Sequence, residues 1–83
     1  MRLRSDVAWR LIDDEIVVFD PVSSQYLTIA GAGVVIWQAL TEGADLDGVV
    51  SRLVETFEVT EDTAREDARG FLDSLRSSGL LAA

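Results

Sequence analysis

Apolar and polar residues follow a period of two in the first third of the chain and a helical period in the remainder. The first third contains three short stretches typical of β-strands, which are 7–12, Glu15–Asp20 and Gln25–Ile29. Asp13 and Asp14 supply a tight turn between the first two, and Pro21 begins the loop before the third. The pattern predicts a three-stranded antiparallel β-meander.

Three stretches with helical spacing of apolar residues follow the meander. They cover residues 34–42, 46–57 and 61–76. Asp45 and Thr60 are residue types that cap helix N-termini, and Gly79 is the type that ends a helix. The leucines at 80–81 are then expected to fold back onto the core. Strands followed by helices predict a small α+β fold, with the helices on one face of the sheet, in a single domain over residues 1–83.

The third predicted strand, Gln25–Ile29, contains no charged residue and no proline. Outer strands normally carry such residues, because they prevent other chains from pairing with the free backbone groups. The first predicted strand carries Arg10, which makes the third strand the less protected edge. We interpret Gln25, Tyr26, Leu27, Thr28 and Ile29 as a docking site for an extended peptide. The alternative is that the third helix shields this edge.

Composition narrows the classes of function. Fifteen acidic residues face seven basic ones, which gives a net charge of −8 and disfavours binding to nucleic acid or to an anionic membrane. The sequence contains no His, Cys or Lys, so the usual nucleophiles and bases of enzymes are absent, and no metal or cofactor is expected. The apolar runs are too short to span a bilayer. A cytoplasmic, non-catalytic binding protein is the expectation.

Residues of the third helix are candidates for the other wall of a peptide groove. They are Ala64, Asp67, Ala68, Phe71 and Leu75. The small alanines would let a bound chain come close, although the same stripe also fits a helix that faces the core.

Arg65, Arg69 and Arg76 recur at a spacing of about one or two helical turns, and they are candidate contacts for acidic residues of a peptide. Charges on a helix surface are more often simply solvated. Trp9 and Trp37 are expected to be packing residues.

The sequence resembles the PqqD-like family, which comprises leader-peptide recognition domains for ribosomally made, modified peptides. The matching segments are 6–10, 16–21, Gln25–Ile29, 31–33, 36–40, 71–75 and 79–81. The resemblance covers essentially the whole chain and implies a winged-helix-like PqqD fold. It also implies that a leader peptide lies as an extra strand against Gln25–Ile29, in a cleft between that strand and the third helix.

Within this family the chain is most similar to the free-standing leader-binding protein of lasso-peptide biosynthesis. Such a domain works beside a separate leader peptidase and an ATP-dependent macrolactam cyclase. A PqqD-type chaperone for a radical enzyme in another peptide-modification or cofactor pathway is the alternative. A winged-helix DNA-binding protein is disfavoured, because residues 61–76 hold five acidic and three basic residues.

Overall fold

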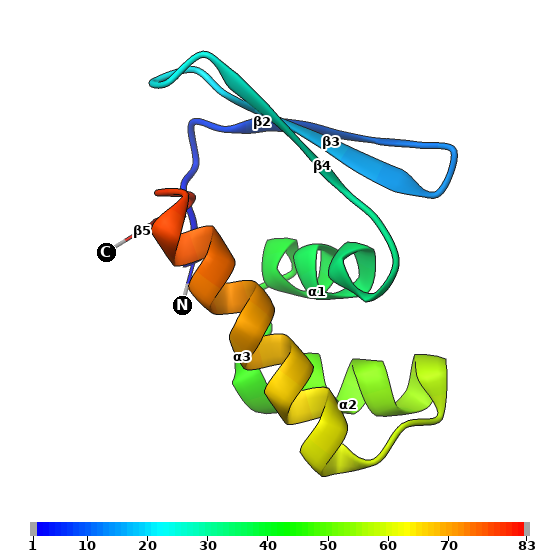
Figure 1. Cartoon of the computed structure of the whole chain (residues 1–83). Helices are drawn as coiled ribbons and strands as arrows, with labels where there is room; N and C mark the ends of the chain where they lie inside the picture. The colour runs from blue at the N-terminus through cyan, green and yellow to red at the C-terminus, as the bar shows by residue number, and fades with distance from the viewer. Residues whose placement is uncertain (1, 83) are drawn as a thin grey trace.

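The structure is a computed structural model and describes residues 2–82. It is an α+β fold in which a sheet lies on one side of three helices (Figure 1). The strands are β1 (Arg2–Leu3), β2 (Ala8–Ile12), β3 (Glu15–Asp20), β4 (Gln25–Ile29) and β5 (Leu81–Ala82). The helices are α1 (Ala32–Thr41), α2 (Leu46–Phe57) and α3 (Glu61–Ser77).

The main sheet is the predicted antiparallel meander, with strand order β2-β3-β4. Asp13 and Asp14 join β2 to β3 with φ angles of 50° and 66°. Two residues with positive φ are what a two-residue hairpin turn requires, and Asp tolerates them. The register places Leu27 of β4 opposite Val18 of β3, and Ile29 opposite Ile16.

Only one face of this sheet is covered. Ile16, Val18 and Ile29 point toward the helices and are buried, while Trp37 of α1 is fully buried beneath them. All three helices lie on this side of the sheet, so its other face is open among residues 2–82 (Figure 1). Tyr26, which belongs to that open face by alternation, is 73% exposed.

The helices begin where the capping residues predict. The Asp45 side chain accepts a hydrogen bond from the Gly48 N–H at 2.8 Å, and the Thr60 hydroxyl accepts one from the Thr63 N–H at 3.2 Å. Helix α1 begins at Ala32, two residues earlier than predicted, because Gly31 serves as its N-cap with a φ of 63°. A glycine adopts this angle without strain, so the helix needs no capping side chain there.

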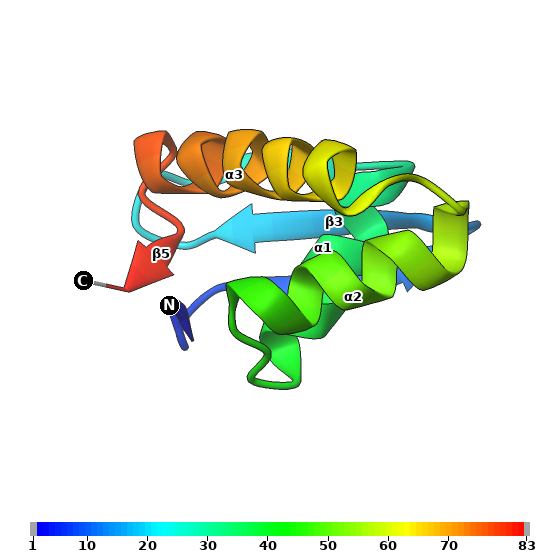
Figure 2. The same ribbon diagram turned by 90° about the horizontal axis from the view of Figure 1, so that it is seen from below.

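Strands β1 and β5 were not predicted. They pair with each other in an antiparallel two-stranded sheet, Arg2 opposite Ala82 and Leu3 opposite Leu81. The two ends of the chain therefore lie side by side (Figure 2). The expected return of residues 80–81 onto the core is confirmed, since Leu80 is buried. No helix within residues 2–82 has the length and apolar character needed to cross a bilayer.

Gly33 allows α1 to approach both β4 and α3 closely. A Cβ at this position would lie 2.7 Å from Cγ2 of Ile29 and 2.8 Å from Cε1 of Phe71. Both distances are far below normal van der Waals contact, so any side chain at this position would require a shift relative to both groups. The closeness of α1, β4 and α3 therefore depends on a glycine at this point.

We expect Gly33→Ala to lower the free energy of unfolding by about 1–3 kcal/mol through overpacking. Gly70→Ala on α3 is the matched control. Nothing lies within 4 Å of a Cβ built at Gly70. Because alanine is the better helix former, Gly70→Ala should raise the free energy of unfolding by about 0.5–1 kcal/mol. Urea titration measures both, and equal stability of Gly33→Ala and the wild type would contradict the close packing.

Candidate peptide-binding cleft

Strand β4 is an edge of the main sheet. Among residues 2–82 it pairs only with β3, so one side of its backbone has no strand partner. Its residues are largely exposed apart from Ile29. No charge, proline or bulge protects this edge.

A hollow of about 290 Å³ separates β4 from α3. Its walls come from β4, from the first turn of α1 and from the C-terminal half of α3. The lining residues are Leu27, Thr28, Ile29, Ala30, Gly33, Phe71, Ser74, Leu75 and Ser78. None of these side chains carries a charge, so this part of the surface suits apolar groups and neutral hydrogen-bonding groups.

A second hollow, of about 320 Å³, continues the first toward the start of β4. It is lined by Val18, Asp20, Ser23, Gln25, Tyr26, Leu27, Ser78 and Leu80. Leu27 and Ser78 belong to both hollows. The two therefore form one groove that follows β4 from Gln25 to Ile29, and we call it the β4–α3 cleft.

Residues 15–81 match the family model of coenzyme PQQ synthesis protein D, PqqD. The match spans most of the chain. The chain belongs to the PqqD family. No curated protein matches it.

Two solved structures share the fold of this PqqD-family domain over nearly its whole length. One is TbiB1 in complex with the TbiA(beta) leader peptide, with a TM-score of 0.95 and 29% identity, covering 100% of this chain and 96% of the other. The second is lasso peptide synthetase B1 complexed with the leader peptide, with a TM-score of 0.88 and 26% identity, covering 99% and 96%. Both of those proteins were solved with a leader peptide.

The five strand residues predicted as a docking site all line the β4–α3 cleft. Of the residues predicted on the third helix, Phe71 and Leu75 line it as well. The sequence did not identify Ser74 and Ser78. A serine on a helix looks like an ordinary solvent-facing residue, and the only available signal was its spacing from Phe71 along one side of the helix.

The expected groove role of Ala64 and Ala68 needs correction, while that of Asp67 stays a prediction. Ala64 and Ala68 are fully buried in the core, so they form no part of the cleft surface. Asp67 is exposed and lies one turn before Phe71 on the same side of α3, but it lines neither hollow. The small side chains of the alanines let α3 pack closely against the other helices instead of against a bound chain.

The predicted arginine stripe also lies away from the cleft. Arg65 donates a hydrogen bond to Asp47 of α2 at 2.9 Å and another to Glu61 at 3.3 Å. Helical spacing puts Arg69 and Arg76 on the same side of α3, which is the side opposite to Phe71 across the buried stripe. Arg76 is bonded to Asp73 at 3.1 Å. Arg65 and Arg76 are therefore bonded to carboxylates of the helices.

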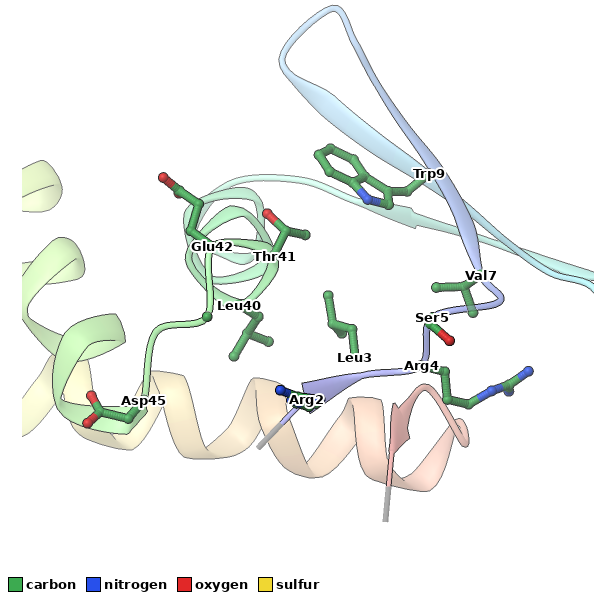
Figure 3. Close-up of a pocket in the computed structure, with 11 residues that line it drawn as sticks. Arg2, Leu3, Arg4, Ser5, Val7, Trp9, Leu40, Thr41, Glu42 and Asp45 are labelled. Carbon is green, nitrogen blue, oxygen red and sulfur yellow. The ribbon is translucent and has the colours of Figure 1, made fainter.

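A larger hollow, of about 690 Å³, lies under the opposite edge of the sheet (Figure 3). Leu3 and Leu40 point toward each other across it, and Trp9 of β2 overhangs it. Trp9 is 41% exposed and meets Trp37 edge-on, with ring centroids 6.3 Å apart. This contact agrees with the expectation that both tryptophans are packing residues. Within residues 2–82 no group of His, Cys, Asp or Glu is placed to hold a metal ion.

Asp20 is the one acidic residue that lines the cleft, and it is nearly buried. Both of its oxygens accept hydrogen bonds from Arg4, at 3.1 Å and 3.2 Å, and one also accepts from the Val22 N–H at 2.9 Å. The bonds from Arg4 lower the pKa of the Asp20 carboxyl, against the opposing effect of burial. The hydrogen bonds to Asp6 and then to Asp20 raise the pKa of the Arg4 guanidinium. The Asp20 carboxylate is therefore ionised, and the positive charge of Arg4 compensates its charge.

The Asp20–Arg4 pair predicts a loss of stability in acid. The pKa of Asp20 is lower in the folded chain than in the unfolded chain, so the folded state holds fewer protons. Its contribution is present above about pH 4, the usual Asp value, and is lost as the pH falls through the lower folded-state pKa.

Urea titrations between neutral and acidic pH test this expectation. The free energy of unfolding should fall more steeply with acid in the wild type than in Asp20→Asn. Asp67→Asn makes the same change in charge at an exposed position and should follow the wild type. Parallel curves for the wild type and Asp20→Asn would contradict the pairing.

Proposed function

We propose that this PqqD-family domain binds the leader region of a ribosomally synthesised precursor peptide as an added β-strand on β4. The bound leader lies in the β4–α3 cleft. The domain then presents the peptide to a separate leader peptidase and a macrolactam cyclase, as in lasso-peptide biosynthesis. It is a non-catalytic adaptor.

The observation that carries this proposal is a cleft beside an edge strand that no other strand covers among residues 2–82. An extended peptide that pairs with such an edge gains backbone hydrogen bonds, and alternate side chains enter the groove. Leu27 and Ile29 already point to the groove side, so the inserted side chains would meet an apolar floor. The two proteins with the same fold that were solved with a leader peptide support leader binding as the function.

The physical benefit of such an adaptor is effective concentration. When the peptide and an enzyme are both bound to the domain, they meet at a high local concentration. Their encounter is then no longer a bimolecular one. The domain needs no catalytic group of its own for this role. The absence of His, Cys and Lys from the sequence agrees with it.

A second candidate is a chaperone for a radical enzyme in another peptide-modification or cofactor pathway. The family model is described by its role in coenzyme PQQ synthesis, which favours this reading. Both candidates use the same cleft, so the enzyme that the domain binds distinguishes them. A DNA-binding role is disfavoured, because Arg65 and Arg76 are already bonded to carboxylates.

Fluorescence anisotropy with a labelled leader tests the proposal directly. The probe is the leader of the precursor peptide encoded beside the gene, and a scrambled leader is the control. We expect saturable binding of the true leader with a Kd between about 1 nM and 1 μM. Equal binding of both peptides, or binding of neither at tens of micromolar, would contradict the proposal.

Filling the cleft should block the peptide. Ser74 lines the cleft and is exposed, so Ser74→Trp introduces a large ring there without disturbing the core. We expect about tenfold weaker leader binding or more, since the ring occupies the peptide's place. Ser77→Trp is the matched control, because Ser77 is exposed on the same helix and lines neither hollow. If both variants bind like the wild type with native circular dichroism, the peptide lies elsewhere.

A further inference from the structure

The Arg4 side chain joins three segments that are far apart in the sequence. Its guanidinium donates to both oxygens of Asp6, at 2.7 Å and 3.0 Å, and to both oxygens of Asp20. It also donates to the carbonyl of Gly79 at 2.9 Å. The Arg4 backbone N–H donates to the Leu80 carbonyl at 2.9 Å. One residue thus connects the N-terminal segment, the end of β3 and the turn after α3.

Two of these three segments form one end of the β4–α3 cleft. Asp20 comes from the end of β3, while Ser78 and Leu80 come from the end of α3 and the turn that follows it. All three residues line the hollow that begins at Gln25. The distance between the two walls is therefore set by whatever holds the turn after α3 against the end of β3.

Arg4 is placed to be that link. It lines neither hollow of the cleft, although it borders the 690 Å³ hollow, and its side chain points away from Leu3 and Leu40 (Figure 3). It is the only side chain in residues 2–82 that bonds both Asp20 and the turn at Gly79. A guanidinium suits this position, because its planar donors reach several acceptors at once, whereas an ammonium cannot span them with the same geometry.

We propose that Arg4 is a positioning residue for peptide binding, which holds the end of the cleft near Gln25 in its open, preformed width. The proposal rests on the leader-binding function given above. Preformed walls spare the peptide the entropic cost of ordering them. The effect of Arg4 is then confined to the part of the peptide that lies beside Gln25, Ser78 and Leu80.

The first test uses the free protein and needs no peptide. Amide chemical shifts of Arg4→Gln should differ from those of the wild type at Ser23, Gln25, Ser78 and Leu80, and those signals should broaden. Arg65→Gln is the matched control, because Arg65 also joins two carboxylates but lies on the α2 side of α3. It should leave the cleft signals unchanged. Unchanged cleft signals in Arg4→Gln would overturn the proposal.

The second test measures leader binding with three peptides. One is the full leader, one lacks about three residues at its N-terminus, and one lacks about three residues at its C-terminus. About three residues of extended chain correspond to roughly half the length of β4. Arg4→Gln should bind the full leader about tenfold more weakly than the wild type, because the peptide must then order the loosened end of the cleft. It should match the wild type with the shortened leader that no longer reaches Gln25. Arg4→Lys should fall between the two proteins.

The outcomes separate this inference from the function on which it rests. If the wild type binds no leader, the proposed function fails, and the shifts of the free protein alone decide whether Arg4 sets the cleft. If the wild type binds and Arg4→Gln binds equally well, the inference fails while the function stands. An equal loss for all three peptides would also overturn it, since that pattern indicates general loss of folding.

Discussion

The cleft depends on the rotation of helix α3 about its own axis. One side of α3 is buried in the core, and the adjacent side lies beside the open edge of β4. Ala64, Ala68, Leu72 and Leu75 form the buried side. Phe71 lies at the boundary and is half-buried, so it contributes to the core and also to the cleft wall. A rotation of α3 in either direction would close the groove or expose the core.

This constraint agrees with the close packing at the first turn of α1. Gly33 meets Ile29 of β4 and Phe71 of α3, which are the two walls of the cleft. Because α1 packs between β4 and α3, it fixes the distance between these two walls of the cleft. The geometry of a surface groove is thus fixed by core packing, which is dense and tolerates little change.

Much of the fold was predictable because its signals are local. The bounds of β3, β4 and α2 agree with the patterns of alternation and capping, and Asp45 is the N-cap in the structure as in the prediction. Strands β1 and β5 have two residues each, which is too short to show any period. Their pairing joins the two ends of the chain, and no local pattern encodes such a contact.

The candidate site divides in the same way. The strand side of the cleft was visible as an edge without charges, while the helix side was not. Small residues such as Ala64 and Ala68 can either leave room for a peptide or allow two helices to approach, and the sequence is the same in both cases. The structure shows that both alanines are buried. Ser74 and Ser78 look like solvent-facing residues until β4 is placed beside them. Both errors concern the rotation of α3 about its axis, which tertiary packing decides.

The pairing of β1 with β5 has a consequence for how such a domain can be joined to other proteins. Because the chain enters and leaves at adjacent points, the domain can be attached by either end, or inserted into a surface loop of another protein, without opening its core. That junction adjoins the turn at Gly79 and Leu80, near one end of the cleft. Covalent fusion there would place a second domain next to the cleft, with the linker length setting how often the two meet.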